Sequence, residues 1–159
     1  MEVKELLQKH TLKCLTGGFV VGLMFAGFMS VMSEVSGSPA FCGTCHTMKE
    51  EAASFAESSH RYQECTDCHL PHDNVVSYWI AKGTTGMNDT YHEVMRDYPA
   101  HIKLSADGRK TVNDNCLRCH EGTMERVHTA FDDADTDCLK CHSRIAHGSN
   151  HLEGGIKVE

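Results

Sequence analysis

The sequence predicts a mostly α-helical protein with much irregular structure, in which one N-terminal transmembrane helix precedes a small domain. An uncharged apolar run near the N-terminus and a cysteine-rich remainder of the chain indicate this organisation. Only 7% of the 159 residues are aromatic and there is one Trp, so side chains alone would form a thin core. We therefore expect short helices, many loops, little or no sheet, and an interior filled by something other than side chains.

Composition and charge exclude one class of partner and point to unusual chemistry. The 15 Lys and Arg residues are outnumbered by 22 Asp and Glu residues, which gives a formal net charge of −7. Nucleic-acid binding calls for a basic surface, so we expect no nucleic-acid partner. The nine Cys and 12 His residues are well above ordinary usage.

The predicted transmembrane helix covers residues 14–33, which carry no charge and lie between Lys13 and Glu34. At 1.5 Å per residue, a helix of this length crosses a hydrocarbon core of about 30 Å. The mild excess of Lys over Glu in residues 1–13 predicts that this flank is cytoplasmic. Residues 34–159 would then form a domain outside the inner membrane.

A cleavable signal peptide is the alternative, because Ser38-Pro39-Ala40 resembles a small-residue cleavage site. The apolar run is longer than the usual signal-peptide core of about 7–15 residues, which favours a retained anchor. Small residues recur every four positions along the predicted helix and would allow a second helix to approach closely, although such residues are also common in membrane helices. These residues are Gly18, Gly22, Ala26 and Ser30.

Eight of the nine cysteines fall in four copies of the pattern C-x-x-C-H, which is the attachment signature of c-type haem. Two thiols at this spacing reach the two vinyl groups of one porphyrin, and the adjacent imidazole is carried to the iron. We therefore predict four covalently bound haem c groups as the core of the domain. The attachment cysteines are Cys42, Cys45, Cys65, Cys68, Cys116, Cys119, Cys138 and Cys141, and the adjacent histidines are His46, His69, His120 and His142.

Zinc ribbons and disulfides also use paired cysteines, but neither requires a His directly after each pair. The motifs begin at residues 42, 65, 116 and 138 and so form two closely spaced pairs. This spacing suggests a duplicated two-haem unit with an insertion between its halves. Cys14 lies outside the motifs, and we expect it to be a free thiol.

Two histidines outside the motifs are candidate sixth ligands. His60 lies five residues before Cys65, and His147 lies five residues after His142, so both are in segments that must pack on a porphyrin. Met48 follows His46 by two residues and either binds iron in its place or packs as an ordinary apolar residue. The roles of five further histidines stay open at this stage: His72, His92, His101, His128 and His151.

The anchor, the four motifs, the C-x-x-C-H-x-M form of the first motif and Ser58-Ser59-His60 before the second together resemble the NapC/NirT family. Members of this family are membrane-anchored tetrahaem quinol dehydrogenases. The short length is most similar to the small subunit of cytochrome c nitrite reductase. The resemblance implies menaquinol oxidation at the first haem and transfer of electrons to a periplasmic catalytic subunit. It implies a quinol-dehydrogenase subunit that does not itself reduce nitrite.

The same resemblance implies roles for particular residues. Met48 would bind the first haem iron instead of His46, Asp89 would cover the distal side of that haem, and Lys82 would contact the quinol. A carboxylate beside a quinol oxygen can accept a released proton, and a nearby ammonium favours its ionised form. His60 and His147 would complete the fourth and third haems. A Lys of the catalytic partner would complete the second haem, whose proximal ligand is His69.

Other functions remain open from the sequence. A quinol dehydrogenase or tethered relay could serve a different periplasmic reductase. A terminal reductase is a further class, but multihaem nitrite reductases usually carry a C-x-x-C-K motif that does not occur here. A soluble shuttle is disfavoured by the anchor. The acidic run 132–137 is either a solvated loop or a docking patch for a partner.

Overall fold

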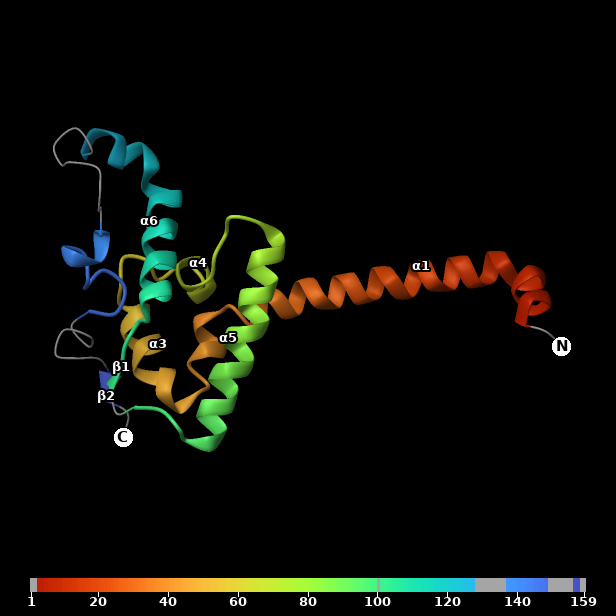
Figure 1. Cartoon of the computed structure of the whole chain (residues 1–159), viewed down its shortest axis with the longest axis horizontal. Coiled ribbons are helices and arrows are strands. Elements are labelled where there is room, and N and C mark those ends of the chain that lie inside the picture. Colours follow the sequence, from red (N-terminus) through yellow and green to blue (C-terminus); the bar gives the residue numbers. More distant parts are fainter. Residues whose placement is uncertain (1–2, 100, 128–136, 149–155, 158–159) are drawn as a thin grey trace. The chain divides into compact units, whose positions relative to one another are not determined.

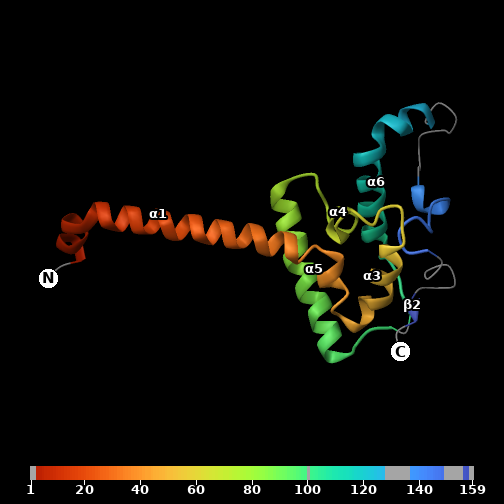
Figure 2. The same ribbon diagram turned by 180° about the vertical axis from the view of Figure 1, so that it is seen from behind.

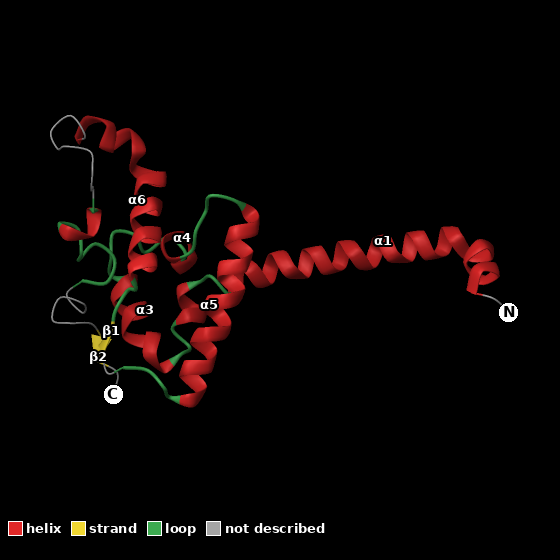
Figure 3. Cartoon of the chain, in the orientation of Figure 1, coloured by secondary structure: helices red, strands yellow, loops and turns green. Residues whose placement is uncertain are grey.

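The structure is a computed structural model that describes residues 3–99, 101–127, 137–148 and 156–157. It confirms the predicted fold class, because helices joined by irregular segments dominate the described chain (Figure 3). Strands β1 and β2 form a short antiparallel ladder in which residue 101 faces residue 157 and residue 102 faces residue 156. The elements in order are α1 Val3–Val35, α2 Pro39–Cys42, η1 His46–Met48, α3 Lys49–Ala56, α4 Cys65–His69, α5 Val75–Met95, β1 His101–Ile102, α6 Ala106–Val127, η3 Cys138–Lys140 and β2 Ile156–Lys157.

The first unit of the chain, residues 1–36, consists of the described helix α1 (Figure 1). Its stretch His10–Val35 has a mean hydropathy of 1.9, and by length and composition it is able to cross a membrane. The backbone leaves helical geometry at His10, with φ −127° and ψ 17°, which bends the helix near its start. The apolar run predicted at 14–33 lies entirely within the part that follows this bend.

Two hydroxyl side chains in α1 form hydrogen bonds to backbone groups of the same helix. The hydroxyl groups of Thr16 and Ser30 each donate to the carbonyl oxygen four residues earlier, at 2.9 Å. Such internal bonds lower the cost of placing a hydroxyl in hydrocarbon. A side chain added at Gly18 or Gly22 would meet nothing within 4 Å, so this small-residue face is open, and self-association through it stays a prediction.

The second unit, residues 37–159, has few apolar side chains in its interior. Among the described residues, the buried apolar side chains are Phe55, Leu70 and Val112, and no large side chain is completely buried. Helix α4 lies between the longer helices α5 and α6 in both views, and α3 lies below α6 (Figures 1 and 2). The thin core that the composition predicts is therefore present, and side-chain packing alone does not explain how these helices hold together.

A buried amide joins helix α6 to α4. The Asn115 Nδ2 atom donates to the carbonyl oxygens of Cys68, at 2.9 Å, and Leu70, at 2.7 Å. Arg118, one turn further along α6, donates to the Asp67 carbonyl oxygen at 3.0 Å. These bonds join the helix that carries the second cysteine motif to the helix that carries the third.

Local signals fix the ends of α5. The side chain of Asn74 accepts a hydrogen bond from the backbone N–H of Ser77, which caps the first turn. At the other end Arg96 adopts a left-handed conformation, with φ 52°, and the N–H of Asp97 donates to the His92 carbonyl oxygen. In the segment between the second and third motifs, α5 is the longest continuous element, and β1 and the first part of α6 follow it.

We predict that replacing Asn115 with Leu lowers the free energy of unfolding by about 2 kcal/mol, because two buried carbonyl groups lose their donor. Guanidinium titration of the purified protein measures the change. The exposed Thr84 on α5 gives a control, since Thr84→Ala removes only a bond to the helix's own backbone. Equal stability of Asn115→Leu and the parent protein would contradict the role given to this amide.

Candidate haem centres

The four C-x-x-C-H motifs occupy four different local structures. The first runs from the end of α2 into η1, the second forms α4, the third lies within α6, and the fourth begins η3. All nine cysteines are in the described part of the chain, and none of them forms a disulfide. The eight motif thiols are therefore available for attachment to a porphyrin.

The thiols of the first two motifs meet, as do those of the last two. Cys42 and Cys65 share a hydrogen bond that lowers the pKa of Cys42 to about 7 and raises that of Cys65. Burial, together with the neighbouring Cys138 thiol, raises the pKa of Cys116 to about 11. The motifs that are close in sequence are therefore adjacent in space, but the second motif also neighbours the third, so the two-haem repeat stays a prediction.

Glu93 of α5 holds the first motif in place. Its carboxylate accepts the backbone N–H of His46 at 2.7 Å and the hydroxyl of Thr47 at 2.7 Å. The hydrogen bond from Thr47, followed by those from the backbone, keeps the pKa of Glu93 below its ordinary value. The sequence analysis missed this residue, although its position four residues after Asp89 places both carboxylates on one helix face.

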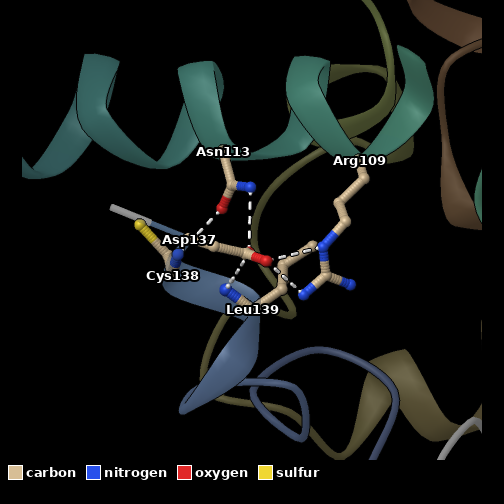
Figure 4. A network of polar contacts seen from close by, with 5 residues as sticks. All are labelled: Arg109, Asn113, Asp137, Cys138 and Leu139. Atoms are coloured by element: carbon tan, nitrogen blue, oxygen red, sulfur yellow. Dashed lines mark hydrogen bonds and ion pairs between the residues drawn. The ribbon is translucent and has the colours of Figure 1, made fainter. Parts of the chain in front are cut away.

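Asp137 holds the fourth motif against α6, as Figure 4 shows. Arg109 forms an ion pair with its carboxylate at 2.6 Å, and Asn113 donates to it at 3.0 Å. The N–H of Cys138 donates to the Asn113 side-chain oxygen at 3.0 Å, and the N–H of Leu139 donates to Asp137 at 3.1 Å. Burial raises the pKa of Asp137, but these hydrogen bonds and the Arg109 charge outweigh burial and lower it.

Two pairs of histidine rings lie at the separation expected for ligands of one iron. The ring centroids of His60 and His120 are 6.1 Å apart, and those of His69 and His147 are 6.2 Å apart. A metal–nitrogen distance of about 2 Å on each side places the centroids of two opposed imidazoles roughly 6 Å apart. The residues present therefore fit a haem held between each pair.

These pairings differ from the ones that the family resemblance implied. His60 faces the His of the third motif instead of the fourth, and His147 faces the His of the second motif instead of the third. The separation of the motifs in sequence gives no indication of this pairing, because it depends on how α3, α4 and α6 pack. His142 of the fourth motif lies just after η3, at the surface.

The remaining histidines that the structure describes make other contacts. The His72 Nε2 atom lies 3.1 Å from the Thr66 carbonyl oxygen, and its ring packs against Tyr78. The His92 Nδ1 atom lies 2.6 Å from the Asp97 carbonyl oxygen. The side chain of His101, and all of His128, His151 and residues 132–136, lie outside the described part of the chain.

Lys82 and Asp89 both lie on α5 near the first motif. Both charges act on the Cys42 thiol. Partial desolvation raises the pKa of Asp89, whereas its hydrogen bond with Asn88 and the nearby His92 oppose the shift. The Lys82 ammonium lies 3.3 Å from the Tyr78 hydroxyl and 5.5 Å from the centre of its ring.

A shallow groove of about 590 Å³ runs along α5 beside Lys82. Most of its lining is apolar or small, and Lys82 supplies its charged end, whereas Asp89 is not part of the lining. The residues that line it are Lys82, Gly83, Gly86, Met87, Thr90, Tyr91, Val94 and Met95. Such a groove is suited to an elongated apolar molecule with a polar head.

Among the described residues, no group of three or more His, Cys, Asp or Glu side chains converges as a metal cage would require. The model of the NapC/NirT cytochrome c family, N-terminal region, matches residues 5–152.

The chain belongs to the NapC/NirT cytochrome c family. As a cytochrome c of this family, it binds haem c covalently.

Individual relatives agree with this assignment. The cytochrome c-type protein NrfH of Wolinella succinogenes is 31% identical over 128 residues, which cover 74% of this chain and 72% of the relative. The cytochrome c-type protein NapC of Paracoccus pantotrophus is 24% identical over 169 residues, covering 87% and 70%. A chain in the crystal structure of the cytochrome c nitrite reductase NrfHA complex bound to the HQNO inhibitor has a TM-score of 0.75 and 28% identity, covering 84% of this chain and 90% of that one.

Replacing Glu93 with Ala should loosen the first motif of this NapC/NirT protein, since the His46 N–H and the Thr47 hydroxyl lose their acceptor. We expect faster amide hydrogen exchange in the peptide covering residues 42–49, measured by mass spectrometry, with peptides from α6 unchanged. Glu57→Ala, at the exposed end of α3, is the matched control. Unchanged exchange at residues 46–47 would show that Glu93 does not hold the motif.

Proposed function

We propose that this chain is a membrane-anchored tetrahaem cytochrome that oxidises menaquinol and passes the electrons to the catalytic subunit of a cytochrome c nitrite reductase. The observation that carries the proposal is the apolar groove along α5 with Lys82 at its end, on the helix whose Glu93 hydrogen-bonds to the first motif. The similarity to NrfH and to a chain of the NrfHA complex supports the choice of partner.

The distribution of side chains on α5 supports a lipid-soluble substrate. Its Glu93 bonds to the first motif, and Lys82 and Asp89 act on that motif electrostatically. In contrast, Met87 and Val94 of the groove are 70% and 74% exposed. A helix with charges toward its own domain and apolar side chains toward the outside can receive a quinol tail along its outer face.

The side chains then have separate tasks in quinol oxidation. The Lys82 ammonium donates a hydrogen bond to a quinol oxygen and orients the head group. Asp89 accepts a proton. Its raised pKa makes the carboxylate a better proton acceptor, because a general base is most effective when its pKa lies near the working pH. When bound, the haem supplies a one-electron acceptor next to this pair, so electrons and protons leave the quinol by different routes.

The proposed iron ligands follow from the motifs and the ring pairs. Met48, in η1, binds the first haem in place of His46, with Asp89 on the distal side. The other proposed ligands are His60, His69, His120, His142 and His147. Two assignments are possible for the sixth ligand of the second haem. One is a Lys of the catalytic partner, and the other is His147, whose ring faces His69.

In the proposed topology, α1 spans the inner membrane once, residues 1–13 face the cytoplasm, and the haem domain is periplasmic. The excess of Lys in the N-terminal flank supports this orientation. A second candidate function is quinol oxidation for another periplasmic reductase. The similarity to NapC of Paracoccus pantotrophus, over 87% of this chain, favours that alternative.

Anaerobic stopped-flow mixing of the detergent-purified protein with a menaquinol analogue tests the quinol site. We expect rapid haem reduction by the parent protein and at least tenfold slower reduction of Asp89→Asn, because the proton acceptor is lost. Asp107→Asn, at an exposed position of α6, is the matched control. Dithionite must reduce all three proteins fully. Equal quinol rates for Asp89→Asn and the parent would contradict the assignment.

The ligand role of Met48 has its own test. We expect Met48→Ala to change the spin state of one haem and leave the others unchanged, because only the first motif contains this residue. Electron paramagnetic resonance of the oxidised protein resolves the signals. Met124→Ala, in α6, removes a thioether outside the motifs. If every signal persists in Met48→Ala, this side chain is a packing residue.

A further inference from the structure

The buried carboxylate of Glu51 takes no part in the quinol site or in haem attachment. Glu51 lies in the first turn of α3, and only 9% of its surface is exposed. Its Oε2 atom lies 2.7 Å from Nδ1 of His147. Its Oε1 atom is buried and has no hydrogen-bond partner.

Such a carboxylate is costly, because half of its acceptor capacity is desolvated without compensation. A negative charge near a helix N-terminus is favourable, but the neighbouring Glu50 supplies one from an exposed position in the same turn. Glu51 is therefore not needed to stabilise the start of α3. The Glu51 carboxylate contacts the imidazole of His147, which lies 96 residues further along the chain.

The contact between Glu51 and His147 determines which ring nitrogen of His147 is available to bind a metal. Because Nδ1 faces the Glu51 carboxylate, Nε2 is the nitrogen left for a metal. The His147 ring lies 6.2 Å from the ring of His69, centroid to centroid, with 38° between the planes. Phe55 flanks the same imidazole at 6.1 Å. The ring is thus held from two sides and presented to the His of the second motif.

We propose that Glu51 is a positioning residue that fixes the His147 imidazole as the second axial ligand of the haem attached at Cys65 and Cys68. This inference rests on the proposed haem attachment and deepens it. A carboxylate hydrogen-bonded to the outer nitrogen of a ligating imidazole fixes the tautomer and ring orientation and makes the ligand more basic. The second haem is then completed within the chain, without a ligand from a partner.

The hydrogen bond between Glu51 and His147 determines in which direction the reduction potential of this haem shifts. A more basic imidazole donates more electron density and stabilises ferric over ferrous iron, so the Glu51 carboxylate lowers the reduction potential of this haem. A change from Glu to Gln keeps a hydrogen-bond acceptor and removes the charge. That substitution separates the electrostatic contribution from simple packing of α3.

The test uses the full chain in detergent, without a partner, and compares Glu51→Gln with Glu50→Gln. Haem content is measured first, by the spectrum of the reduced pyridine complex, and a redox titration follows. We expect four haems in each protein. In Glu51→Gln the potential of one haem moves upward and its low-spin resonance signal shifts, whereas Glu50→Gln matches the parent. Glu51→Asp should restore most of the parent potential.

A second variant identifies the ligand directly. His147→Ala should convert one low-spin, two-histidine signal to a high-spin or differently ligated signal in the isolated chain. If both His147→Ala and Glu51→Gln keep four haems with parent signals, the inference is wrong and the proposed function stands. A second-haem signal that becomes low-spin only when the catalytic subunit is added would also overturn it. Absence of covalent haem in the parent protein would instead refute the proposed function.

Discussion

The structure depends on one constraint, which is that the domain after the anchor has almost no apolar core of its own. Phe55, Leu70 and Val112 are the buried apolar side chains among the described residues, too few to offset the entropy of ordering the domain. In the proposed account, covalently bound porphyrins supply the missing apolar surface. The groups that complete the core would then also be the groups that carry electrons.

Polar side chains fix the positions of the haem-attachment motifs, because apolar packing in this domain is sparse. Glu93 fixes the first motif, Asn115 joins the second motif to α6, and Asp137 fixes the fourth. Each forms hydrogen bonds to backbone groups at a motif, so it controls where the thiols point. Electron transfer between haems requires fixed spacing, and directional hydrogen bonds fix position more specifically than non-directional apolar packing does.

The sequence was sufficient for the fold class, the anchor and the haem attachment, because covalent chemistry fixes the spacing of C-x-x-C-H. It was not sufficient for the pairing of His60 with His120 or of His147 with His69, which joins residues 60 and 78 positions apart. Glu51 and Glu93 were missed for the same reason, since an acidic residue in a helix is usually solvated. Asp89 and Lys82 were identified from family resemblance, and their position beside the first motif is consistent with it.

The central claim is that four covalent haems form the interior of this domain, and the intact mass of the purified chain tests it most directly. We expect the mass of the polypeptide plus four haem groups, and the loss of one haem in Cys116→Ala, Cys119→Ala double variants. The remaining chain should then unfold more readily, because part of its core is missing. A mass equal to the polypeptide alone, or to the polypeptide with bound zinc and a folded domain, would contradict the account.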